Sequence, residues 1–203
     1  AKLLGFLREP EAVLRRYPET QNDVPARIAR AIVWQRQGKL RKAAITLAPA
    51  VQQHPEDPYL HELMGQLHFK GGEIPAAIAA YERALARTEA QALMLSDFAR
   101  VLVAKDTPAD RTRAFTLLKR AKALDPTYHQ SWRLLADIYG RRGHTGKAEL
   151  ALAELAALRG DRTALKMRLK RARARLEPGT PHALRAEDLS RYATTLKESE
   201  DGE

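Results

Sequence analysis

The stretch Trp132-Arg-Leu-Leu-Ala-Asp-Ile-Tyr-Gly-Arg-Arg-Gly143 decides the fold of this chain. Trp132, Leu135 and Tyr139 recur at helical spacing, so their side chains lie on one side of a helix. Ala136 is a small residue that lets a second helix come close, and Gly143 supplies the turn that follows. The stretch therefore predicts the first helix of a closely packed helical hairpin.

The same pattern recurs at about the 34-residue period of a helical repeat. Small residues fall at corresponding places in four consecutive segments, residues 24–57, 58–91, 92–128 and 129–161. A turn glycine recurs in three of these segments and a closing proline in two. The third segment is longer than the others, and the excess falls in Lys105-Asp-Thr-Pro-Ala-Asp110, which we interpret as the turn between its helices. The pattern resembles the tetratricopeptide (TPR) repeat. This resemblance implies an all-α fold, a right-handed superhelix (α-solenoid) of stacked antiparallel helix hairpins.

The predicted array covers residues 24–176, because leucines at helical spacing continue over residues 162–176 as a degenerate closing helix. Residues 1–23 are predicted to form a helical pair that ends an upstream region. Since the chain lacks an initial Met and starts as if inside a helix, we expect that it was cut from a longer protein. Pro49, inside the second helix of the first repeat, should cost about 3 kcal/mol relative to Ala and kink or shorten that helix.

The C-terminal part, residues 177–203, follows a clear break at Pro178-Gly-Thr-Pro181. We expect a short helix over residues 182–192 that docks back on the array. The acidic tail after it is expected to be frayed.

Composition limits the chemistry that the chain can perform. It has no cysteine, which excludes disulfides, thiolate metal sites and cysteine nucleophiles. The net charge of +10 permits nucleic acid, anionic lipid or acidic protein as partners and selects none of them. No apolar run approaches the length of a membrane span.

Catalysis finds no support in the motifs, because the chain has no H-E-x-x-H, G-x-S-x-G or phosphate-binding loop. His61 and His68 are seven residues apart, so they share a helical face and could in principle share a metal. They occupy the positions of Trp132 and Tyr139, which favours a packing role. We therefore expect that this chain is not an enzyme and holds no metal or cofactor of its own. Trp132 itself is expected in the core.

Partner binding is better supported. In the TPR family, side chains of successive first helices line a concave groove. The candidate partner-binding residues carried over from the resemblance are Arg36, Tyr59, Glu62, Gln66, Phe69, Lys70, Arg100, Arg133 and Arg141. Ser96 and Val103 fall at the same repeat positions.

Arg36, Lys70 and Arg141 share the thirteenth position of their repeats and would form a row of cations, here called the basic rail. Such a groove suits an extended or helical peptide that carries acids. The alternative is that these long side chains only keep the groove soluble. The carboxylate clamp of the family is not expected, because Ile28 and Ile32 stand where it needs Lys and Asn.

Residues 166–175 carry six cations, which makes a nucleic-acid or lipid patch conceivable. No aromatic residues interleave them, so base stacking is not indicated, and a solvated helix face is the favoured interpretation.

Several stretches resemble a narrower family, the C-terminal repeat tail of bacterial BepA-like (Ste-type) zinc metalloproteases. They are residues 2–7 (Lys-Leu-Leu-Gly-Phe-Leu), 14–18 (Leu-Arg-Arg-Tyr-Pro), 24–27 (Val-Pro-Ala-Arg), 57–63 (Asp-Pro-Tyr-Leu-His-Glu-Leu), 139–143 (Tyr-Gly-Arg-Arg-Gly) and 159–161 (Arg-Gly-Asp). The resemblance implies a periplasmic location, zinc in an upstream H-E-x-x-H domain and a chaperone-like role in outer-membrane protein quality control. Acidic segments or outer-membrane assembly components would be its partners.

The alternatives are a free-standing TPR scaffold or assembly protein, a cytoplasmic location, and a nucleic-acid-binding module that uses residues 166–175.

Overall fold

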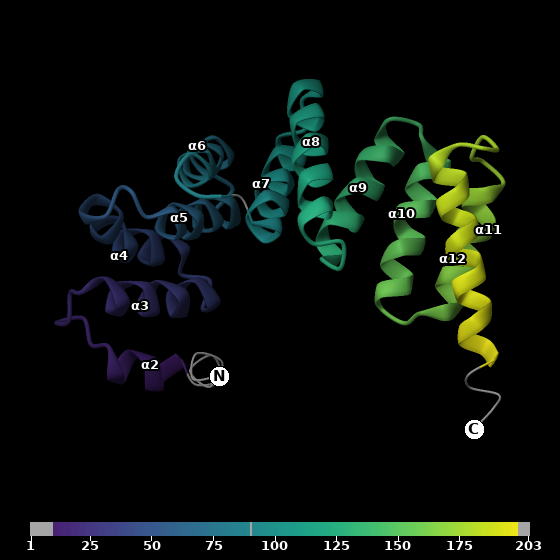
Figure 1. The fold of residues 1–203 in the computed structure, drawn as a ribbon. Helices are drawn as coiled ribbons and strands as arrows, with labels where there is room; N and C mark the ends of the chain where they lie inside the picture. The colour runs from purple at the N-terminus through teal and green to yellow at the C-terminus, as the bar shows by residue number, and fades with distance from the viewer. Residues whose placement is uncertain (1–9, 90, 199–203) are drawn as a thin grey trace. The chain divides into compact units, whose positions relative to one another are not determined.

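The computed structural model describes residues 10–89 and 91–198, and all the regular structure within these ranges is helical (Figure 1). The chain divides into two compact units, Ala1–Ala90 and Gln91–Glu203. No helix within the described ranges is both long and apolar enough to cross a membrane. The first helix of the pair predicted over residues 1–23 and the end of the acidic tail lie outside the described residues.

The first unit is a stack of antiparallel helix pairs (Figure 1). Its helices are α2 (Pro10–Arg16), α3 (Val24–Arg36), α4 (Leu40–Gln53), α5 (Pro58–Lys70) and α6 (Ile74–Leu85). The aspartates before α3 and α5 cap them: Asp23 accepts a hydrogen bond from the Ala26 amide at 2.8 Å, and Asp57 accepts one from the Tyr59 amide at 2.8 Å. These capped pairs begin within a residue of the predicted repeats.

The second unit continues the pairing and ends in a three-helix group. Its helices are α7 (Ala92–Lys105), α8 (Pro108–Leu124), α9 (His129–Arg141), α10 (Thr145–Leu158), α11 (Arg162–Arg173) and α12 (Pro181–Glu198). Along α12, Ala186, Leu189 and Ala193 are buried in one core with residues of α10 and α11. The C-terminal helix is therefore longer than expected and does dock back on the array (Figure 1).

Small residues sit where the helices meet, as the repeat pattern predicts. The alanines at the predicted small positions that have no exposed surface are Ala31, Ala43, Ala50, Ala77, Ala84, Ala99, Ala114 and Ala121. Gly65 is the extreme case, because a Cβ atom there would lie 2.9 Å from the Tyr81 ring. Only glycine permits the approach of α5 and α6 at this point.

The turns inside the hairpins share one geometry. Gly38, Gly72 and Gly143 have left-handed backbones with φ of 73°, 78° and 74°. The third repeat differs, since Asp106 takes the left-handed conformation at φ 60° and Thr107 caps α8. The turn itself is only Asp106 and Thr107, because Lys105 ends α7 and Pro108 begins α8. The prediction that the extra residues form the turn was therefore wrong: they lengthen α8, which has 17 residues.

Pro49 does not shorten its helix. The helix α4 runs to Gln53, four residues beyond the proline. Pro49 lacks the amide hydrogen that would reach the Ile45 carbonyl, and the Ile45 side chain is 64% exposed. Water at this exposed side can solvate the unpaired carbonyl, so the helix continues.

Candidate functional site

In the first unit, the predicted groove residues lie along α3 and α5. Arg36 and Lys70 end their helices and are exposed, and Tyr59 at the start of α5 is 54% exposed. Glu62 is buried, and the Gln66 amide donates to its carboxylate at 3.4 Å. Phe69 is half-buried. The face of α5 thus presents an aromatic ring near one end and a cation at the other.

In the second unit, the predicted groove residues are engaged with neighbours. Arg100 forms an ion pair with Asp97 at 3.0 Å, and Arg133 is exposed. The Arg141 guanidinium lies 3.0 Å from Asp137 and 2.8 Å from Asp106. Hydrogen bonds and ion pairs with Arg111 and Arg141 hold the pKa of Asp106 below its usual value. Two carboxylates therefore offset the charge of Arg141, which weakens its share of the basic rail.

Ser96 and Val103 do not line a groove. Val103 is buried, and the Ser96 hydroxyl is fully buried against the hydroxyl of Ser131 at 2.8 Å. Since α7 and α9 pack directly on each other here, these two positions serve the interior.

The two histidines of α5 have partners that explain their positions. The buried His61 ring lies with Nε2 2.8 Å from the Pro55 carbonyl oxygen, and His68 Nδ1 lies 2.5 Å from a Glu73 oxygen. Within the described ranges, no three residues among histidines, aspartates and glutamates are grouped closely enough to hold a metal ion. The packing role of His61 fits this geometry, and the cofactor prediction stays a prediction.

Trp132 departs from its expected place in the core. The ring is only half-buried, and its Nε1 donates to the Pro126 carbonyl at 2.7 Å. The reason is that its helix α9 meets α8 and α10 without closing over the indole, which leaves one side of the ring facing a cavity. This cavity was not predicted from the sequence.

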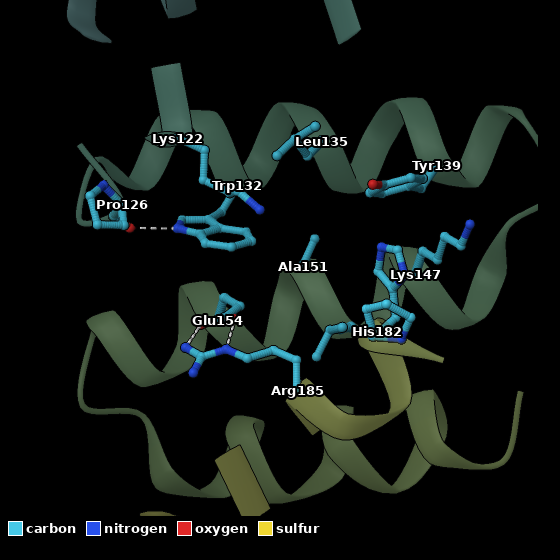
Figure 2. A pocket seen from close by; sticks show the side chains of 12 residues that line it. Lys122, Pro126, Trp132, Leu135, Tyr139, Lys147, Ala151, Glu154, His182 and Arg185 are labelled. Carbon is cyan, nitrogen blue, oxygen red and sulfur yellow. Dashed lines mark hydrogen bonds and ion pairs between the residues drawn. The ribbon is translucent and has the colours of Figure 1, made fainter. Parts of the chain in front are cut away.

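The cavity, here called the Trp132 cavity, has a volume of about 480 Å³ and lies wholly within the second unit. Helices α8, α9, α10 and α12 surround it. Figure 2 shows Trp132 and Tyr139 projecting from α9, Ala151 from α10, and His182 and Arg185 from α12 around one open space. The lining residues are Lys122, Pro126, Trp132, Leu135, Tyr139, Lys147, Leu150, Ala151, Glu154, Pro181, His182 and Arg185.

Charge in the Trp132 cavity is predominantly positive. Glu154 is the only acid among the described residues that line it, and the Arg185 guanidinium donates to both Glu154 oxygens, at 2.6 and 2.9 Å (Figure 2). This leaves Lys122, whose ammonium lies 5.1 Å from the Trp132 ring centre, and Lys147. Burial and these two lysines lower the pKa of His182 below its usual value.

The basic stretch 166–175 is partly neutralised. Arg168 and Arg171 reach back to Glu149 of α10, at 3.0 and 3.8 Å. Lys166, Lys170 and Arg173 instead line a second cavity of about 570 Å³ between α11 and α12, together with Ser190 and Thr194. These contacts argue against a continuous nucleic-acid-binding surface. They favour a helix face that packs against the neighbouring helices α10 and α12.

Comparisons with family models and with curated proteins found no match. Similar folds occur among solved structures. The crystal structure of MamA is 15% identical, covers 84% of this chain and 95% of its own length, and has a TM-score of 0.59. YrrB, described as a TPR protein with an unusual peptide-binding site, is 17% identical over 88% of this chain and 99% of its own, with a TM-score of 0.55.

A third structure, TTC0263, a thermophilic TPR protein of Thermus thermophilus, is 16% identical over 82% of this chain and 98% of its own, with a TM-score of 0.60. At these identities the likeness concerns the fold alone. It confirms the predicted fold class, an all-helical α-solenoid of the TPR type.

Proposed function

We propose that this chain is a protein–protein interaction module that binds a peptide segment of its partner along the first helices of the hairpins. The observation that carries the proposal is the face of α5, where Tyr59 is 54% exposed and Lys70 is exposed eleven residues later on the same side of the helix. The ring and the cation lie about 16 Å apart along the helix axis. They therefore suit an apolar residue and an acid that are several residues apart in a bound peptide.

The partner segment is acidic in this proposal. Arg36 of α3 and Lys70 of α5 are both exposed and end consecutive first helices of the same unit. Long-range attraction from a net charge of +10 would speed the encounter with an acidic partner. One structural neighbour, YrrB, is described as having a peptide-binding site, which gives a precedent for the fold.

The finer part of the proposal concerns the parent protein. The stretches that resemble BepA-like proteases support a role as the partner-recruiting tail of a periplasmic zinc metalloprotease, with the metal and the catalysis in an upstream domain. Sequencing the source gene upstream of Ala1 tests it. A signal peptide followed by H-E-x-x-H supports the protease tail, and an upstream region without that motif leaves a TPR scaffold or assembly protein.

Binding along α3 and α5 is tested by charge reversal. Peptides are selected from a random library on the full chain, and their affinities are then measured by fluorescence anisotropy. The double variant Arg36→Glu and Lys70→Glu should lose at least about tenfold in affinity for the acidic peptides. The matched control reverses Arg41 and Arg83, which are exposed on α4 and α6. Selected peptides without acids, or equal losses in both variants, would overturn the proposal.

A further inference from the structure

The Trp132 cavity has the size of a ligand site. Its volume of about 480 Å³ falls within the roughly 300–1,000 Å³ typical of small-molecule pockets. Four helices surround it, and α12 is fixed to α10 by the bidentate contact of Arg185 with Glu154. The hydrogen bond from Trp132 Nε1 to the Pro126 carbonyl, at 2.7 Å, helps to orient the indole ring along the cavity wall.

The walls of the cavity select a flat apolar group. The Trp132 and Tyr139 rings, both half-buried, stand on one side (Figure 2), and Leu135, Leu150 and Ala151 complete the apolar lining. Ring faces and edges exposed in this way favour a second aromatic ring at stacking or edge-to-face distance. An aliphatic chain would bury area here without using that geometry.

The rim of the cavity selects an anion. Lys122 from α8 and Lys147 from α10 both line it, and the one acid of the described lining, Glu154, is already engaged by Arg185. His182 also lines the cavity, and the centre of its ring lies 6.4 Å from the centre of the Tyr139 ring. A ligand carboxylate would pair with a lysine ammonium group in this positively charged lining.

We propose that the Trp132 cavity is a binding site for a small aromatic carboxylate, with the ligand ring on Trp132 and Tyr139 and its carboxylate paired with Lys122, while Lys147 adds to the positive charge of the lining. The site uses none of the residues of α3 and α5 assigned to peptide binding, so it stands or falls independently of that function. The ligand enters beside α12, and Lys122 moves off the Trp132 ring to meet the carboxylate.

The test uses the full chain and 3-phenylpropionate as the probe, with 3-phenylpropionamide as the uncharged match. Calorimetry on the unaltered protein should detect binding of the acid and show that the amide binds at least about tenfold more weakly. The chain has two tryptophans, so the Trp34→Phe variant reports on Trp132 by fluorescence. Equal binding of acid and amide, or no binding of either in the millimolar range, overturns the proposal.

Variants locate the site. Lys122→Gln with Lys147→Gln should remove the preference for the acid, whereas Lys119→Gln with Lys166→Gln, outside the cavity, should keep it. Ala151→Leu fills the cavity and should abolish binding of both probes. Acid binding that survives Ala151→Leu overturns the assignment even if the lysine variants behave as expected, and thermal melts of each variant confirm folding.

A further experiment distinguishes two ligands that both carry an aromatic ring and a carboxylate, a small acid and the C-terminal end of a peptide. The peptide N-acetyl-Ala-Ala-Phe is compared with a free C-terminal carboxylate and with a C-terminal amide. If the free-acid peptide binds no more tightly than 3-phenylpropionate, the assignment to a small acid holds. Binding at least about tenfold tighter would overturn it in favour of a peptide end. Reversal of Arg36 and Lys70 should leave every affinity in this series unchanged.

Discussion

The hydroxyl groups of Ser96 and Ser131 lie 2.8 Å apart, and both side chains are fully buried between α7 and α9. Each hydroxyl satisfies the other, so removing one leaves the other without its partner. Ser131→Ala should lower the free energy of unfolding by about 1–3 kcal/mol, and Ser96→Ala with Ser131→Ala should cost less than the single change. Urea unfolding of both variants measures this. A double variant less stable than the single one would contradict it.

Arg185 holds α12 through the buried Glu154. The Arg185→Met variant keeps the apolar stem and leaves a carboxylate that is only 9% exposed without its two donors. We expect a loss of about 1–3 kcal/mol in stability, concentrated in α12, and faster amide exchange there. The control is Arg191→Met, because Arg191 pairs within α12, with Asp188. Uniform exchange across both variants would contradict this anchoring role.

Gly65 marks the closest approach of two helices. The Gly65→Ala variant would place a Cβ atom 2.9 Å from the Tyr81 ring and should cost about 1–3 kcal/mol. Gly140 in α9 is the matched control, because a Cβ there meets nothing within 4 Å. Gly140→Ala should therefore stabilise by about 0.5–1 kcal/mol. Thermal unfolding of the two variants should shift in opposite directions, and shifts of the same sign would be inconsistent with this packing.

The two tryptophans should differ in their contribution to stability. Trp34 is 7% exposed, whereas Trp132 is half-buried. Trp34→Ala should cost about 3–5 kcal/mol, as for a buried aromatic. Trp132→Ala should cost about 1–3 kcal/mol, because much of the ring already meets solvent in the cavity. Chemical unfolding measures both losses. A larger loss for Trp132→Ala than for Trp34→Ala would contradict the half-buried position of Trp132.

Acid should destabilise the second unit through Asp110. The Thr107 hydroxyl donates to the Asp110 carboxylate at 2.5 Å, and Lys105 lies 3.3 Å away; both lower the pKa of Asp110. A lowered folded-state pKa contributes stability above the unfolded pKa of about 3.9, and this stability is lost as the pH falls through the folded pKa. Unfolding measured between pH 7 and 2 should show a decline below about pH 4. Asp110→Asn should flatten that decline, and an unchanged slope would rule out this contribution.

Much of the fold could be predicted because helix packing requires small residues at regular intervals in the sequence. Residues such as Ala43 and Ala77 are small at fixed intervals since another helix lies against them. Equivalent repeat positions also share a hydrogen bond. His61 and Trp132 each place a ring nitrogen next to the carbonyl oxygen of the proline six residues earlier, at 2.8 and 2.7 Å. Two chemically different rings fill one repeat position, which composition alone would not suggest.

The Trp132 cavity could not be predicted, because it depends on where α12 docks. Ala186, Leu189 and Ala193 recur at helical spacing, so the sequence does indicate an apolar face on this helix. It does not indicate which helices that face covers. The offset of Arg141 was hidden for a similar reason: its partner Asp106 lies 35 residues earlier, in a turn whose left-handed residue is not a glycine.

The Trp132 cavity also has an order of assembly. Hairpins such as α7 with α8 join neighbours in sequence and can form as soon as both helices leave the ribosome. Lys122 and Arg185, which border the same space, are separated by 63 residues. During synthesis the side of the Trp132 cavity that α12 lines therefore stays open until α12 has emerged. A nascent chain, or a protein truncated before α12, would have the helical hairpins but not the complete Trp132 cavity.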